Sequence, residues 1–106
     1  MEKRARQRKK TSVSVRFGTD RPDRMGLITD VSARGIYITT NAVLPRGSAV
    51  QVHVPVSGGE PVLLEGQVIR CRRVAPQLIM LTKGGMAVHL ATAPAAWRAS
   101  QTLSED

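Results

Sequence analysis

Strict alternation marks one stretch of the chain, Ala49-Val50-Gln51-Val52-His53-Val54-Pro55-Val56. Valine fills every second position, so this segment would be apolar on one face if its backbone were extended. Successive side chains of a β-strand point to opposite faces of the sheet. The stretch therefore predicts a strand with one buried face and indicates a β protein.

Further segments of this kind lie on both sides of it, at intervals of roughly 8–12 residues. They cover residues 13–17, 25–31, 36–40, 62–71, 78–81 and 86–90, with glycine- and proline-containing turns between most of them. Because no helical period intervenes, we expect an antiparallel barrel or sandwich of six or seven strands.

Glycine and proline predict several local features. Leu44-Pro45-Arg46-Gly47 has the proline and glycine positions of a type I turn. Gly66 lies inside the expected strand 62–71, where glycine often marks a bulge or a barrel corner. Alanines follow Pro94 and predict a short helix, after which the chain should be mobile. We therefore expect a basic arm at 1–10, a barrel at 11–92, and a short helix with a tail at 93–106.

The composition is that of a single small domain. The chain has 106 residues, 42% of them hydrophobic, and only three aromatic residues, Phe17, Tyr37 and Trp97. Valine, leucine, isoleucine and methionine must therefore fill the core, and Phe17 should point inward. No apolar run approaches the roughly 18 residues of a membrane-spanning helix. The basic N-terminus leads into an alternating segment, so we expect neither membrane insertion nor a signal peptide, and a cytoplasmic location.

Residues suited to catalysis are sparse. One cysteine and two histidines cannot build a disulfide or a typical metal set. His53 and His89 fall on the polar faces of expected strands and are interpreted as surface residues. Cys71 is interpreted as a half-buried packing residue, and Asp30 and Ser32 lack a histidine placed for a catalytic triad. The sequence thus predicts a protein that is not an enzyme and has no cofactor.

Charge is concentrated at the start of the chain, which has a net charge of +8. Residues 1–10 contain six lysines and arginines against Glu2. Such a segment favours an anionic partner, although a solvated tail that only aids solubility would have the same charge.

Within this arm, Arg4 and Arg8 are four residues apart. Arginine has a planar fork that binds phosphate, or the O6/N7 edge of guanine, through two hydrogen bonds. The two side chains would share a face if the arm formed a turn. In an extended arm they would stand roughly 13 Å apart, enough to bracket two phosphates.

A second motif, Asp30-Val31-Ser32-Ala33-Arg34-Gly35, joins two expected strands. The Asp30 carboxylate could accept hydrogen bonds from guanine N1–H and N2–H, and the Ser32 hydroxyl can donate or accept. Gly35 is typical of a position that needs positive φ or a close approach of the backbone to a ligand. Taken alone, the motif is better interpreted as a plain turn stabilised by its aspartate.

Together, RxxxR before the first strand and DxSxxG between the next two resemble the ligand motif of the PilZ domain family. The resemblance covers about residues 3–92. It includes Val15-Arg16-Phe17, Leu44-Pro45-Arg46-Gly47, Glu65-Gly66-Gln67-Val68 and Gly85-Met86-Ala87-Val88.

The resemblance implies a six-stranded antiparallel barrel with a C-terminal helix that binds the bacterial second messenger cyclic di-GMP without catalysis. The implied ligand-binding residues are Arg4, Arg8, Asp30, Ser32, Gly35 and the neighbouring Arg34. The arm should be mobile without ligand and close on the barrel with it. The signal would then pass to a partner protein, for which Arg70, Arg72 and Arg73 form a candidate contact.

Two alternatives remain open at this stage. A small basic barrel could bind nucleic acid through the same arm, but single-strand binders stack bases on exposed aromatic residues. Only Tyr37 and Trp97 are available for that role, so nucleic acid is the less favoured partner. The chain could also be a PilZ-like interaction module that binds no ligand.

Overall fold

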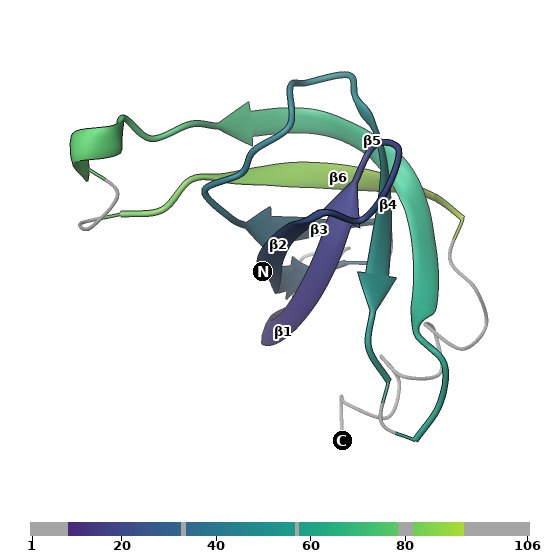
Figure 1. The fold of residues 1–106 in the computed structure, drawn as a ribbon. Coiled ribbons are helices and arrows are strands. Elements are labelled where there is room, and N and C mark those ends of the chain that lie inside the picture. Colours follow the sequence, from purple (N-terminus) through teal and green to yellow (C-terminus); the bar gives the residue numbers. More distant parts are fainter. Residues whose placement is uncertain (1–8, 33, 57, 79–81, 93–106) are drawn as a thin grey trace, which may run out of the picture.

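The computed structural model describes residues 9–32, 34–56, 58–78 and 82–92. It contains six β-strands and one short 3-10 helix (Figure 1). The strands are β1 (Lys9–Gly18), β2 (Arg24–Val31), β3 (Gly35–Thr39), β4 (Ala49–Val54), β5 (Val62–Arg72) and β6 (Gly85–Thr92), and the 3-10 helix η1 is Pro76–Leu78. This is an all-β fold, as the alternating segments predict.

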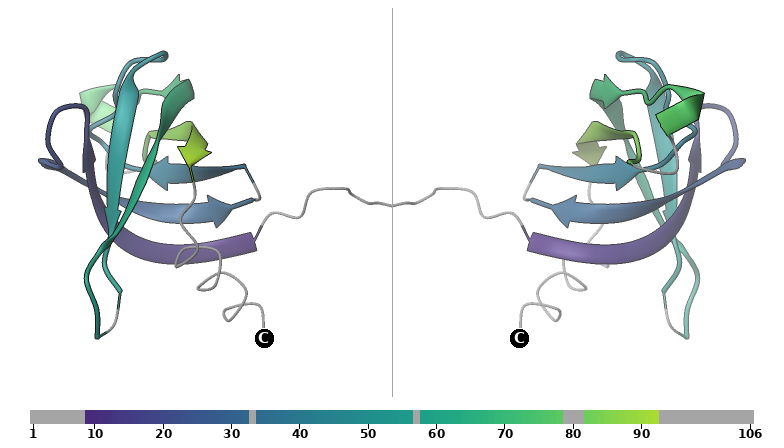
Figure 2. Two further views of the ribbon diagram at one scale, coloured as in Figure 1. Left: turned by 90° about the vertical axis from the view of Figure 1, so that its right-hand side faces the viewer. Right: turned by 90° about the vertical axis from the view of Figure 1, so that its left-hand side faces the viewer.

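The strands form a closed antiparallel barrel in the order β1-β2-β3-β6-β5-β4. Strand β1 closes the barrel because it pairs with two strands. It pairs with β2 along most of its length, and its last residues, Arg16–Gly18, also pair with β4. Figure 2 shows the strong curvature that this double pairing requires. Closure pairs the backbone N–H and C=O groups that would be left without partners at the edges of an open sheet.

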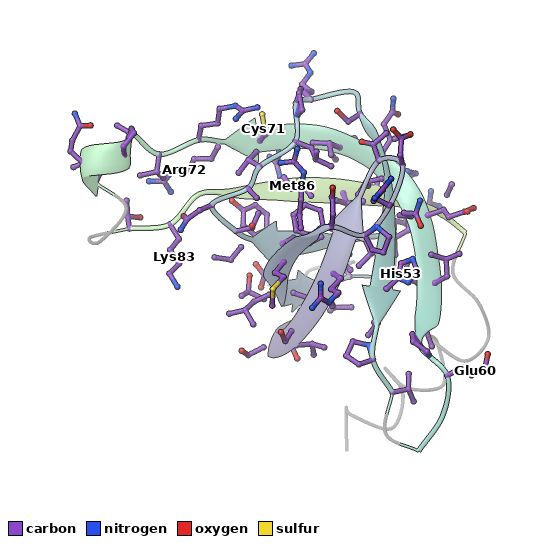
Figure 3. The ribbon with its side chains drawn as sticks, viewed as in Figure 1. His53, Glu60, Cys71, Arg72, Lys83 and Met86 are labelled. Atoms are coloured by element: carbon purple, nitrogen blue, oxygen red, sulfur yellow. The ribbon has the colours of Figure 1, made fainter. Side chains whose placement is uncertain are left out.

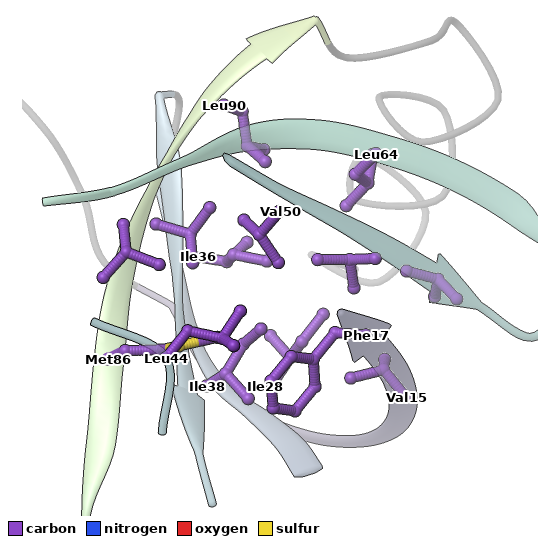
Figure 4. Close-up of a cluster of buried hydrophobic side chains, with 14 of the residues drawn as sticks. Val15, Phe17, Ile28, Ile36, Ile38, Leu44, Val50, Leu64, Met86 and Leu90 are labelled. Atoms are coloured by element: carbon purple, nitrogen blue, oxygen red, sulfur yellow. The ribbon is translucent and has the colours of Figure 1, made fainter. Parts of the chain in front are cut away.

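Every strand contributes alternate side chains to one core (Figure 4). Three of the four valines in the stretch that predicted a strand are buried, with Val50, Val52 and Val54 at 3%, 0% and 5% exposure, whereas Val56, beyond the end of β4, is 38% exposed. Phe17 is completely buried, as expected, and burying such a side chain contributes about 1.5–3 kcal/mol. The period of two in the sequence thus corresponds directly to the inner face of the barrel.

Register shifts place bulges in four of the strands, β1, β2, β5 and β6. The register shifts between Lys10 and Val13 in β1, and between Ile28 and Asp30 in β2. The pairing of β5 with β6 shifts at Glu65/Gly66, where the extra residue is Ala91 of β6, and again at Val68/Arg70, where it is Ile69 of β5. The register thus shifts at Gly66, as its position suggested, but the bulged strand there is β6. A Cβ atom at Gly66 would collide with the carbonyl oxygen of His89 on β6.

Some expected boundaries differ from the structure. Leu78, expected to begin a strand at 78–81, lies in η1, and residues 79–81 are outside the described part of the chain. Strand β5 pairs directly with β6, so the barrel closes with six strands and has no place for a seventh. The strand predicted to reach Val56 ends at Val54, because Pro55 lacks the N–H needed to continue the ladder.

The turn expected as type I at 44–47 lies one residue further along. Ser48 N donates to Pro45 O over 3.1 Å, and Gly47 has φ = 93° at the third position, as in a type II turn. The helix expected after Pro94 lies outside the described residues. Within those residues, no helix is long and apolar enough to cross a membrane.

Candidate functional site

The turn between β2 and β3 is built around two hydrogen bonds to one acceptor. Ser32 N donates to Gly35 O over 2.9 Å, and Ser32 Oγ donates to the same oxygen over 3.3 Å. The Ser32 hydroxyl group therefore donates a hydrogen bond that stabilises the turn, and the lone pairs of its oxygen can still accept a hydrogen bond from a ligand.

Asp30 lies on the outer face of the barrel because of the bulge in β2. Ile28 and Val31 are both buried although they are three residues apart, a spacing that places residues on opposite faces of a regular strand. The extra residue between Ile28 and Asp30 restores Val31 to the core and turns Asp30 outward. There Asp30 is half-buried and directly opposite Tyr37 of β3.

Gly35 is held close to strand β6. Its φ does not lie in the left-handed region, and an added Cβ would lie 2.6 Å from Val88 O. Leu90 N donates to Arg34 O over 2.9 Å and fastens the end of the turn to the same strand. The close approach at Gly35 is therefore to the backbone of β6, and the approach to a ligand expected from the sequence stays a prediction. The Arg34 side chain next to Gly35 is exposed.

Arg4 and Arg8 lie outside the described residues. The segment that follows them is described, however, and β1 begins at Lys9 rather than at the expected boundary of 11. Lys9 pairs with Val31, and Lys10 pairs with Asp30. The residue that directly follows RxxxR therefore lies beside the first residues of DxSxxG.

The two histidines, His53 and His89, have different surroundings. His53 is half-buried, and its Nε2 lies 3.0 Å from Gln51 Oε1. His89 is exposed and directly opposite Gly35. Sequence reasoning assigned both to the surface and missed the position of His89, because only the pairing of β3 with β6 brings it to the turn.

Cys71 is exposed, not half-buried as expected. Strand β4 pairs with β5 only as far as Gln67, so Cys71 and Arg72 lie where β5 extends beside β6 alone (Figure 3). In the part of the chain that the structure describes, no three histidine, cysteine, aspartate or glutamate residues form a group that could hold a metal ion.

Comparison with known families identifies the fold. The sequence pattern of the PilZ domain matches residues 2–81. The chain belongs to the PilZ domain family. PilZ domains are a family of cyclic di-GMP receptors and are generally non-catalytic. The matched range spans the positions of Arg4, Arg8 and the 30–35 turn, and the closed six-stranded barrel is consistent with the PilZ fold.

A solved PilZ-domain protein has the same fold. The Bacillus subtilis inhibitor of motility, MotI/DgrA, superposes with a TM-score of 0.66 at 17% sequence identity. The likeness covers 94% of this chain and 47% of that one, so the present chain spans about half of its length. At this identity the likeness shows the fold alone. No curated protein sequence matches the chain.

Proposed function

We propose that this PilZ domain is a non-catalytic receptor that binds cyclic di-GMP through Arg4, Arg8 and the 30–35 turn. One observation carries the proposal. Strand β1 begins at Lys9, opposite Val31, so the arm enters the barrel beside the turn. This entry supports a single site shared by two motifs that are about twenty residues apart in the sequence.

Chain connectivity limits how far the arginines can stand from that site. Arg8 is joined directly to Lys9, and consecutive Cα atoms are about 3.8 Å apart. Arg4 is four residues further away, which allows at most about 14 Å more. Chain connectivity therefore allows both guanidinium groups to reach a ligand on the turn.

The turn and the arm have complementary chemistry for a guanine nucleotide. Asp30 and Ser32 present oxygen acceptors, which match guanine N1–H and N2–H and do not match phosphate. The arginines provide the phosphate partners, in charge-assisted and bidentate hydrogen bonds. Arg34, which is exposed within the turn, adds a further cation.

Ligand binding would draw the arm onto the barrel. Residues 3–8 carry four cations and little apolar surface, so burial alone would not order them. Hydrogen bonds to the ligand would supply the missing free energy. We propose that a partner protein then recognises the closed arm and that the signal leaves the domain in this way.

Calorimetric titration with cyclic di-GMP tests the proposal, with cyclic di-AMP and GTP as controls. We expect saturable binding of cyclic di-GMP and much weaker binding of both controls. Equal binding of all three would indicate a general anion site. Binding of none would identify the domain as an interaction module.

A further inference from the structure

His89 stands on the outer face of β6, next to the turn. Its neighbours Val88 and Leu90 are buried, with 1% and 8% exposure, so the side chain between them points outward. It is exposed and lies opposite Gly35 on one side and Gln67 of β5 on the other.

Gly35 and His89 form a non-hydrogen-bonded cross-strand pair. Leu90 N donates to Arg34 O, so the hydrogen bonds flank this pair and do not join it. Such pairs have Cα atoms about 4.5 Å apart and the closest side chains. A Cβ added to Gly35 would lie 3.7 Å from the Cα atom of His89. Because glycine has no side chain, the imidazole borders a bare strip of backbone.

Ser32 borders the same strip from the other side. It is bonded to Gly35 O through both its backbone N–H and its hydroxyl. A planar group lying over Gly35 would thus meet Ser32 at one side and His89 at the other.

The other described aromatic residues do not reach this strip. Phe17 is completely buried. Tyr37 shares the outer face of β3, but its ring lies over Gly85, the partner of Thr39 two residues further from the turn. Among the described residues, His89 is therefore the exposed aromatic ring that adjoins the turn.

We propose that His89 is a ligand-contacting residue whose imidazole ring packs against a guanine base lying over Gly35. The inference rests on the proposed function and adds a residue that neither sequence motif contains. Base stacking on a protein ring depends on a flat aromatic face, not on a particular hydrogen bond. Asp30 and Ser32 would select guanine by its donors, and His89 would hold its face.

Three variants separate ring packing from hydrogen bonding. We expect His89→Ala to weaken cyclic di-GMP binding by roughly 5- to 150-fold, the range of alanine substitutions at stacking positions. His89→Phe retains a flat aromatic ring, and its affinity for cyclic di-GMP should fall by less than about fivefold. His89→Gln retains hydrogen-bonding groups without the ring and should lose as much as His89→Ala. The matched control is Gln67→Ala, in the same cross-strand row but one strand further from the turn, and it should bind like the wild type.

Proton NMR of the histidine rings supplies a readout that a purely structural role would not change. Cyclic di-GMP should shift the ring signals of His89 upfield, as a stacked purine does, and leave those of His53 in place. Thermal unfolding of all four variants should match the wild type.

The possible failures are distinguishable. If Asp30→Ala weakens binding while His89→Ala and the His89 signals show no effect, the His89 contact is wrong and the proposed function stands. If His89→Gln binds as well as His89→Phe, ring packing is overturned. If the wild-type domain does not bind cyclic di-GMP, both proposals are overturned.

Discussion

Two connections between strands use glycine for different reasons. In the loop between β4 and β5, Gly58 has φ = 75°, and an added Cβ would have open space around it. In the turn between β2 and β3, Gly35 has no such dihedral, and an added Cβ would meet Val88 O at 2.6 Å. Glycine is needed for backbone conformation at Gly58 and for close approach to a neighbouring strand at Gly35.

This difference changes how the DxSxxG motif is interpreted. Gly35 is already accounted for by the packing of β3 against β6, so its presence is not evidence of a ligand. The evidence for binding lies instead in Asp30, Ser32 and the arginines, which barrel closure does not require. A PilZ domain without a ligand could therefore keep the glycine and lose the other residues.

The largest effect that we expect in this comparison concerns stability. Gly35→Ala should lower the free energy of unfolding by about 1–3 kcal/mol, the usual cost of overpacking a site with little space. Gly59→Ala is the matched control, because an added Cβ there has nothing within 4 Å and the backbone is not left-handed. It should be neutral or stabilising by up to about 1 kcal/mol. Urea unfolding of both variants measures the difference, and equal stability would show that Val88 O does not constrain Gly35.

The next effect concerns the outer face of the turn. Asp30→Ala should weaken cyclic di-GMP binding by roughly 1–3 kcal/mol, because it removes an ionised acceptor. Binding to RNA should be unchanged or slightly stronger, since a negative charge is lost. Asp23→Ala removes the same charge from an exposed position before β2 and should bind cyclic di-GMP normally. Titration of both variants checks this. An Asp30→Ala variant with wild-type affinity would overturn the guanine assignment.

The smallest effect is expected at Ser32. Ser32→Ala removes the long hydrogen bond from Ser32 Oγ to Gly35 O but keeps the bond from the backbone. Stability should fall by about 0.5–1.5 kcal/mol, and affinity should fall by a similar amount. Ser14→Ala, at an exposed position of β1, is the control. If neither stability nor affinity changes, the Ser32 hydroxyl has no role in the turn or the site.

The barrel could be predicted from the sequence because its cause is local. Alternation at Val50, Val52 and Val54 specifies an inner face whichever strands lie beside it. Where the prediction failed, a neighbour or a proline decided the outcome. Leu78 was expected to begin a strand, but Pro76 begins a 3-10 helix that includes Leu78, and β5 pairs directly with β6. Cys71 is exposed because β5 runs past the end of its pairing with β4, a length that the sequence does not reveal.

The candidate site was predictable only in part, for the same reason. The motif spacing placed Asp30 and Ser32 in a turn; Ser32 lies in the turn between β2 and β3, whereas Asp30 lies near the end of β2. Two features depended on strand register and could not be read from the chain. These are the entry of Lys9 into β1 opposite Val31, and the position of His89 beside Gly35.

The most direct test of the central claim compares arginines within the arm, by titration with cyclic di-GMP at low and at moderate salt. Arg8→Lys keeps the positive charge but removes the planar guanidinium group. It should therefore lose most of the cyclic di-GMP affinity that Arg8→Ala loses. Arg6→Lys makes the same change outside the RxxxR pair and should have little effect. Lys9→Ala with Lys10→Ala removes two charges and should matter much less once salt screens them.

The account predicts a large loss for Arg8→Lys at both salt concentrations beside a nearly normal Arg6→Lys. In nucleic-acid binding each lost cation counts about equally. The receptor function would be contradicted if Arg8→Lys bound cyclic di-GMP with nearly normal affinity while the variant lacking Lys9 and Lys10 bound it much more weakly.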